Sequence, residues 1–224
     1  MVNIWVSDYM LNSMSYVLFN NGVLKHTLTK KDLPPEDRGV LNTTCTSLRC
    51  FGNLVPQAAT AYPNASVEME MAVSTYPIAS MSKSGLNITS SGTVACRARL
   101  INGSLVPLFR ANVSAAILLT ASLSGDMILR GNITEITSVI HVTETQIGRI
   151  SDEILTTVSN QIAKTIAIPR LNVICQKGIP IPSIKDVRFV NIRMDNDDHC
   201  FHISTDVKYI ASDETKVLRF LPND

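Results

Sequence analysis

From Ser66 onward, apolar and polar residues alternate along the chain, and this period of two limits the fold more than any other feature of the sequence. Such alternation indicates a half-buried β-strand, because successive side chains point to opposite faces. The apolar positions of the first run are Val67, Met69, Met71 and Val73. Further β-prone segments follow at 93–100, 113–123, 127–133 and 136–143, with bends expected near Gly125 and Asn132. We predict a meander of long antiparallel strands with one wet face.

Two amphipathic helices are expected, one near each end of the chain. Ser7 can cap a helix that begins at Asp8, is richly apolar and stops before Gly22. Ser151 is the second predicted cap, followed by two acidic residues. The apolar stripe behind it, at helical spacing, is Ile154, Leu155, Val158, Ile162 and Ala163. Pro169 is expected to break this second helix.

Shorter elements complete the expected fold. They are a strand at 23–28, a surface turn at 30–39, a short helix at 54–62, an extended segment at 179–182, and strands at 187–194 and 200–209 joined by an acidic turn at 195–198. A single α+β domain over residues 1–210 is therefore predicted, with a long antiparallel sheet that carries two helices. Residues 211–224 are predicted to form a loose polar tail.

Charge and motifs exclude several classes of function. The formal net charge is +1, which gives no strong global field for nucleic acid. No GxSxG, HExxH, GxGxxG or P-loop pattern occurs, so neither an enzyme nor a cofactor is expected. The aspartates at 195–198 fail as a calcium loop, because Cys200 stands where glycine is required. His199 and His202 are interpreted as surface or hydrogen-bonded residues, and no metal site is predicted.

The five cysteines fit two states of the chain. Cys45 and Cys50 can close a small ring, and Cys175 and Cys200 both flank the loop and strands near the end of the chain. We predict disulfides in these two pairs, with Cys96 a free thiol on the apolar face of its strand. Five reduced thiols are the alternative for a cytosolic protein.

Six Asn-X-Ser/Thr sequons point to the secretory pathway. Asn42, Asn64 and Asn102 are the best candidates for glycosylation because they adjoin turn signals. Asn112 and Asn132 sit where strand pairing could limit access, and the sixth sequon is Asn87. The first residues do not form a signal peptide, so an extracellular chain that is a fragment of something longer is expected.

Several short segments, in order and in register, resemble one known family. They are Met1-Val2, Ser7-Asp8-Tyr9, Gly22-Val23-Leu24, Phe51-Gly52, Pro56, Tyr62-Pro63-Asn64, Pro169-Arg170-Leu171-Asn172, Gln176-Lys177-Gly178-Ile179-Pro180-Ile181-Pro182, Asp206-Val207 and Tyr209. The chain resembles the C-terminal half of the bactericidal/permeability-increasing protein family, which includes the lipopolysaccharide-binding protein and the phospholipid and cholesteryl ester transfer proteins. The resemblance covers nearly the whole chain.

This resemblance implies a strongly twisted antiparallel sheet rolled around a long helix, one half of a boomerang, with an apolar tunnel for acyl chains. Phospholipid or lipopolysaccharide, a bacterial membrane surface and the absent N-terminal half are the implied partners, with no nucleic acid. Together with the apolar helices, it predicts that the tunnel is lined by Met10, Met14, Val17, Val94, Cys96, Ala98, Ile154, Val158 and Ile162. The alternative is a solid-cored interaction module, because a stripe such as Ile154, Val158 and Ile162 is also typical of plain core.

Overall fold

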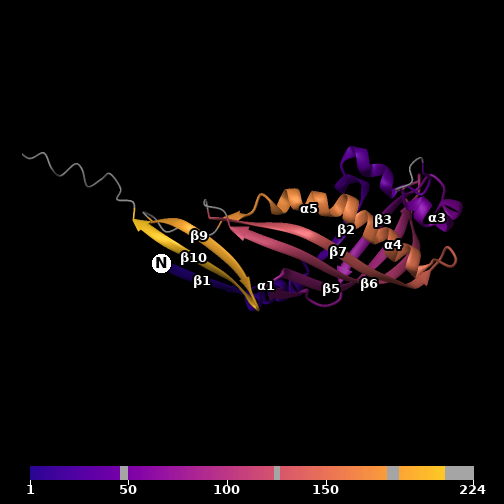
Figure 1. Ribbon diagram of the computed structural model, residues 1–224. Coiled ribbons are helices and arrows are strands. Elements are labelled where there is room, and N and C mark those ends of the chain that lie inside the picture. Colours follow the sequence, from indigo (N-terminus) through magenta and orange to yellow (C-terminus); the bar gives the residue numbers. More distant parts are fainter. Residues whose placement is uncertain (46–49, 124–126, 181–186, 210–224) are drawn as a thin grey trace, which may run out of the picture.

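Two antiparallel sheets and a long helix form the molecule, whose computed structural model describes residues 1–45, 50–123, 127–180 and 187–209 (Figure 1). The larger sheet has seven strands in the order β2-β3-β5-β6-β7-β8, with β4 paired to β5. Its strands are β2 (Lys25–Leu28), β3 (Ser66–Val73), β4 (Ile78–Ser82), β5 (Gly85–Arg99), β6 (Leu105–Leu123), β7 (Ile128–Thr145) and β8 (Ile179–Pro180). The predicted α+β fold with a long antiparallel sheet is confirmed.

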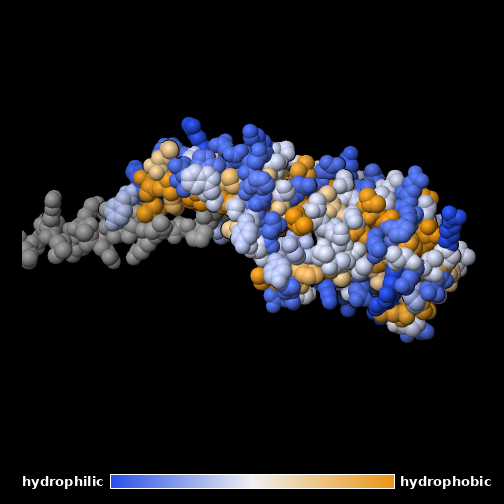
Figure 2. Space-filling model, turned by 90° about the horizontal axis from the view of Figure 1, so that it is seen from below, coloured by the Kyte–Doolittle hydropathy of each residue, from blue (hydrophilic) through white to orange (hydrophobic). Residues whose placement is uncertain are grey.

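The smaller sheet lies at one end of the elongated molecule and has the order β1-β10-β9. Its strands are β1 (Val2–Ser7), β9 (Val187–Asp197) and β10 (Cys200–Tyr209). Trp5 of β1 is 62% exposed and stacks on His202 of β10. Apolar residues reach the surface at this end of the molecule (Figure 2).

Short helical segments lie at one end of the larger sheet, and longer helices run along its edges. They are α1 (Asp8–Asn20), the 3₁₀ turns η1 (Lys30–Asp32) and η2 (Pro35–Leu41), α2 (Phe51–Leu54), α3 (Pro56–Ala61), α4 (Asp152–Ile162), the π-turn η3 (Ala163–Ala167) and α5 (Ile168–Cys175). Ser151 caps α4 as predicted, since its side chain accepts a hydrogen bond from the N–H of Ile154. Ser7 precedes α1 but makes no side-chain cap.

Pro169 does not end the second helix, and that prediction is wrong. The chain continues from α4 through the π-turn η3 into α5, which runs to Cys175. Proline has no N–H and its ring collides with the preceding turn of an α-helix. A π-turn widens the helix by one residue, so Pro169 falls in the first turn of α5, where an N–H is not needed.

Polar side chains of the long helix replace the missing strand neighbour along the edge of β7. The Asn160 amide accepts from the N–H of Ser138 and donates to its carbonyl, at 2.7 and 3.0 Å. Asn172 does the same with Ile133, and Asp152 and Thr156 accept from the N–H groups of neighbouring β7 residues. These side chains lie four residues apart or a multiple of four, so they share one face of the helix. An edge strand covered in this way cannot pair with another chain.

Helix α1 closes the opposite edge in the same manner. The Asn12 side chain exchanges two hydrogen bonds with the backbone of Ala79 in β4, at 2.9 and 2.7 Å. Ser15 donates to the carbonyl of Pro77 just before that strand. The strand group β4-β5-β6-β7 therefore has a helix on both edges.

The core consists of two apolar clusters at opposite ends of the larger sheet. One contains Phe51 and Val55 of the short helices, Leu155 of α4 and strand residues such as Cys96 and Ala98. The other joins Leu86 of the larger sheet to Phe201 of the smaller one. Residues midway along the strands belong to neither buried cluster, which leaves the centre of the sheet less covered than its ends.

Several predicted boundaries are corrected. No turn interrupts the chain at Asn132, because residues 128–145 form one strand; a β-bulge lies nearby at Thr134, where Leu118 and Leu119 of β6 pair with Glu135 and Ile133. The predicted helix 54–62 is divided at Pro56. The turn at 30–39 folds into η1 and η2, and the strand expected at 23–28 begins only at Lys25. Gly125, residues 181–182 and the tail 211–224 lie outside the described residues.

One predicted disulfide is present and the other is not. Cys45 and Cys50 are bonded, with Cα atoms 5.7 Å apart. Cys175 and Cys200 are free thiols, so that pairing is wrong. Cys175 ends α5 beside the larger sheet, whereas Cys200 pairs with Ser7 in the smaller sheet, so different sheets hold them. Cys96 is a buried free thiol, and burial raises its pKa to about 12.

Candidate functional site

The larger sheet has two chemically different faces. We call the side that carries both core clusters the inner face and the opposite side the outer face. On β5 the even-numbered residues from Leu86 to Ala98 are inner, and on β6 the odd-numbered residues from Ala111 to Ala121 are inner. Cross-strand pairing continues these rows to β3 and β7, for example from Val73 through Gly92.

A groove opens on the inner face between the two core clusters. Its volume is about 390 Å³, and its walls are mainly apolar. Met71, Val94 and Val113 form part of its floor and are half-buried, so side chains of an apolar row remain in contact with solvent. Lys25 and His26 of β2 are exposed and line the same groove. An apolar floor with cationic or hydrogen-bonding groups at one side suits an amphipathic ligand.

Gly92 shapes this groove at its centre. A methyl group placed on its Cα would lie 2.5 Å from the backbone oxygen of Ala72 in β3. Glycine is therefore required where β3 and β5 approach each other closely. Because Gly92 has no side chain, it also leaves open the space between Val73 and Val113, its neighbours in the same inner row.

The structure brings together only part of the predicted lining set. Val94 lines the groove, and Cys96 and Ala98 follow it on the same face of β5, where both are buried in the adjacent cluster. On α4, Val158 and Ile162 are half-buried and Ile154 is 56% exposed. Met10, Met14 and Val17 on α1 are each more than half exposed and line none of the described grooves of the sheet.

Helix α1 contacts the protein through a face that mixes polar and apolar residues. Its polar Asn12 and Ser15 make hydrogen bonds to β4 and the residue before it, and Leu11 packs against the core cluster that contains Leu86. Met10 and Met14 face solvent. Apolar composition alone does not tell which residues of the helix contact the sheet, which is why sequence reasoning placed Met10 and Met14 in a lining.

Several groove residues were missed by the sequence prediction. Met71 and Val73 were recognised as apolar strand positions, and Val113 begins a β-prone segment, but periodicity alone does not tell a filled core from an open groove. Lys25 and His26 gave no signal, because their position depends on β2 pairing with β3.

Several charged groups lie at the starts of the helices and tie them to strands. The Val142 N–H and His141 hold the pKa of the Asp152 carboxyl below its usual range. His199 lies 3.0 Å from Asp8, and His202 contacts Asn3 and Trp5, so both histidines are hydrogen-bonded surface residues as predicted. Within the described ranges, no cluster of three or more His, Cys, Asp or Glu is arranged to hold a metal ion. No helix there is long and apolar enough to cross a membrane.

The three favoured sequon asparagines lie in or beside turns. Asn64 is exposed with a positive φ of 58°, and Asn102 is exposed, with its side-chain oxygen accepting from the N–H and hydroxyl of Ser104. Asn42 is half-buried and forms an isolated bridge to Ser66. Their glycosylation stays a prediction.

Comparison with known proteins decides the family. The sequence profile described as LBP / BPI / CETP family, C-terminal domain, matches residues 1–209. This chain belongs to that family. The inner groove and the helix-covered edges of the sheet are therefore features of an LBP / BPI / CETP C-terminal domain.

Curated members of the family match over almost the whole chain. The chain is 26% identical over 209 residues to a bactericidal permeability-increasing protein of Sebastes schlegelii, covering 93% of this chain and 43% of that protein. It is 27% identical to a lipopolysaccharide-binding protein of Bos taurus and 25% identical to that of Homo sapiens, both over 214 residues, 94% of this chain and 42% of the relative. The chain thus spans less than half the length of these relatives.

A solved structure has the same fold. The crystal structure of lipopolysaccharide binding protein superposes with a TM-score of 0.60 over 95% of this chain and 44% of that one, at 17% identity. At this identity the likeness establishes the fold, an α+β arrangement of antiparallel sheets with one long helix.

Proposed function

We propose that the inner groove binds the acyl chains of a phospholipid or lipopolysaccharide, as part of an extracellular lipid-binding protein of the LBP / BPI / CETP family. The observation that carries the proposal is that Val94 and Val113, apolar inner-face residues in neighbouring cross-strand rows, are only partly buried in a groove of about 390 Å³ between two filled core clusters. Leaving apolar side chains in water is unfavourable by roughly 25 cal/mol per Å² of apolar area, so a ligand that covers them gains that free energy.

The rim supports an anionic head group. His26 pairs with the inward Met71, is exposed and lines the groove, so its ring N–H can reach a phosphate oxygen while the acyl chains lie along the floor. Lys25 pairs with the outward Ala72 and is exposed at the rim of the same groove. Two relatives are lipopolysaccharide-binding proteins, which supports the same ligand class. The matching region is the C-terminal domain, and an N-terminal half is the expected partner.

The proposal is tested by extracting and quantifying phospholipid from the full chain secreted by a eukaryotic cell behind an added leader. Val94→Trp fills the groove and is expected to lower bound lipid about tenfold, since a blocked apolar site forfeits its burial free energy. Val73→Trp fills it from β3 and guards against a folding failure of the first variant. The matched control is Thr137→Trp, on an exposed residue of the outer face.

Two outcomes would contradict the proposal. The first is folded wild-type chain without lipid, which favours the solid-cored interaction module. The second is equal lipid in the inner and outer tryptophan variants.

A further inference from the structure

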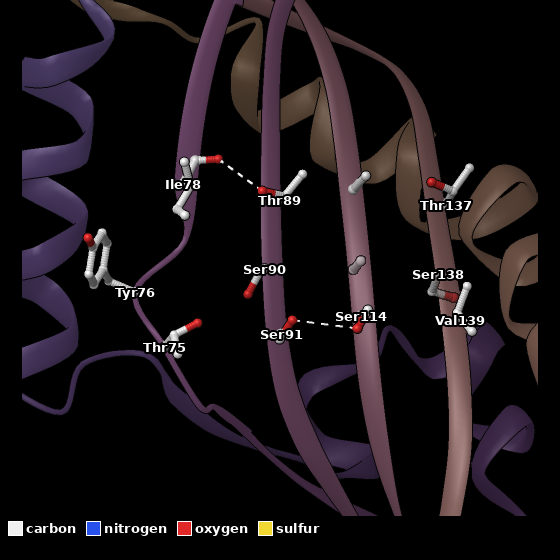
Figure 3. Close-up of a pocket in the computed structure, with 12 residues that line it drawn as sticks. Thr75, Tyr76, Ile78, Thr89, Ser90, Ser91, Ser114, Thr137, Ser138 and Val139 are labelled. Atoms are coloured by element: carbon white, nitrogen blue, oxygen red, sulfur yellow. Dashed lines mark hydrogen bonds between the residues drawn. The ribbon is translucent and has the colours of Figure 1, made fainter.

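The outer face of the same sheet carries an uncharged groove that the lipid proposal does not use. Its volume is about 350 Å³, and it lies across β5, β6 and β7 (Figure 3). Thr89, Ser91, Ser114 and Thr137 present hydroxyl groups to it. Tyr76 stands at its side beside α1, 38% exposed and packed edge-on against Tyr16. Hydroxyl groups beside an exposed aromatic ring suit a neutral sugar, which offers both hydroxyls and apolar C–H faces.

A second polar hollow of about 380 Å³ continues this groove along the strands. The two share Ala116 and Thr137. Asn87 lines the second hollow, together with serines of β4 and the following turn. Glu135 is a charged residue in the lining of this second hollow. The hydroxyl-rich trough therefore reaches a sequon asparagine at one of its ends.

Two sequons are built into this trough. Asn87-Ile88-Thr89 and Asn112-Val113-Ser114 each contribute their hydroxyl residue to its lining. Since β5 and β6 are antiparallel, with Thr89 opposite Ala116 and Ser91 opposite Ser114, Asn87 and Asn112 lie beyond opposite ends of the hydroxyl stretch. Each is about 7 Å along its strand from its own hydroxyl residue.

Both asparagines are available for modification. Asn87 and Asn112 are exposed, and no hydrogen bond engages either side-chain amide in the described structure. By contrast, the amides of Asn12, Asn160 and Asn172 are fully occupied with strand edges. Asn112 lies within the central strand β6, yet its side chain points outward, so strand pairing does not bury it.

We infer that Asn87 and Asn112 carry N-linked glycans whose first sugars lie in the outer trough. In the transfer, the asparagine amide nitrogen attacks the anomeric carbon of an oligosaccharide held on a polyprenyl diphosphate. The N–C bond forms, the C–O bond to the diphosphate breaks, and the amide gives up one proton while the polyprenyl diphosphate leaves. The inference rests on the extracellular part of the proposed function, because only chains in the secretory pathway meet this donor. Asn132 also projects outward, but neither it nor Thr134, the hydroxyl residue of its sequon, lines either hollow.

The test uses the full chain secreted from a eukaryotic cell, with glycopeptide mass spectrometry to measure occupancy at each sequon. Asn87 and Asn112 are expected to be occupied. An N-glycan amidase is expected to release these two glycans about fivefold more slowly from the native protein than from the Thr137→Trp variant. The tryptophan fills the trough and removes the weak contacts between the sugars and its lining. Val139→Trp repeats the test from another exposed lining residue. Any glycan at Asn102, in a turn away from the trough, is the internal control. Its release rate should be the same in wild type and in both tryptophan variants.

Lipid is measured on the same preparations to separate the two proposals. If Asn87 and Asn112 carry no glycan while Asn64 or Asn102 does, the inference is wrong. The extracellular assignment and the lipid site are unaffected by that result. Equal rates of glycan release in wild type, Thr137→Trp and Val139→Trp would contradict the claim that the first sugars lie in the trough. Occupied and protected Asn87 and Asn112 in a chain without lipid would support the inference while the lipid proposal fails.

Discussion

The inner and outer faces of the sheet are built by alternate residues of the same strands, yet the outer groove carries more hydroxyl groups and the inner groove is more apolar. On β6, Val113 and Ala115 face the inner groove, whereas Ser114 and Ala116 line the outer one. Both faces are hollow at the same level of the sheet, midway between the two core clusters. The difference shows that a period of two can assign two separate sites to one set of strands, an apolar site on one side and a hydroxyl-rich site on the other.

The two faces also differ in the interactions that stabilise them. Helices α1 and α4–α5 clamp the sheet edges through side-chain amides, and Leu155 of the long helix is buried in the core on the inner side. The outer face has surface ion pairs instead, such as Arg97 with Glu70 and Arg99 with Glu68. Exposed pairs of this kind contribute little to stability. Changes at the clamp should therefore affect the inner site far more than the outer one.

The largest effect is expected from Asn160→Leu, which removes the amide that pairs with Ser138. A backbone N–H and a carbonyl of β7 lose their partners, so the free energy of unfolding should fall by about 2–4 kcal/mol. Urea denaturation measures the change, and binding of an apolar dye should rise as the helix loosens from the inner face. The exposed neighbour Gln161→Leu is the control. Equal losses of unfolding free energy in the two variants would contradict the role of the Asn160 amide in holding the helix to β7.

An intermediate effect is expected at Gly92, the centre of the inner face. Gly92→Ala places a methyl group against the Ala72 backbone and should lower the free energy of unfolding by about 1–3 kcal/mol. Thr93→Ala, on the adjacent exposed residue, should cost less than about 1 kcal/mol. Thermal unfolding of both variants checks the difference. A Gly92→Ala protein as stable as wild type would mean that β3 and β5 do not approach this closely.

The smallest effect concerns Asp152, which ties the first turn of α4 to β7. Its pKa is lowered in the folded protein by the Val142 N–H and then by His141, so the unfolded state binds more protons and stability rises with pH. Wild type should be more stable than Asp152→Asn at neutral pH. The difference should vanish as pH falls from about 3.9 through the lower folded pKa. Denaturation at several pH values measures this, and a pH-independent difference would contradict the carboxylate's role.

The sequence predicted the sheet better than the site. Alternation located β3 correctly, and Ser151 located the start of α4, since both signals are local. The strands β1 and β4 were missed because they are short edge strands whose pairing joins distant segments. Pro169 misled because a π-turn accommodates it, and α1 misled because its Met10, Met14 and Val17 face solvent.

The groove itself could not be derived from local patterns. Val94 and Val113 look like core residues in sequence, yet both are only partly buried, with Val94 packed at the margin of one core cluster. The pairing of Cys175 with Cys200 failed for a related reason, since nearness in chain order said nothing about which sheet each would join.

Photocrosslinking tests the contrast between the two faces most directly. A phospholipid with a photoreactive group in one acyl chain is loaded into the full chain, activated, and its adducts are mapped by mass spectrometry. Adducts are expected on inner-face residues of β3, β5 and β6, in particular Met71, Val94 and Val113, with none on Ser114 or Thr137. Adducts confined to the outer face or to α1, or no adduct at saturating lipid, would contradict the account.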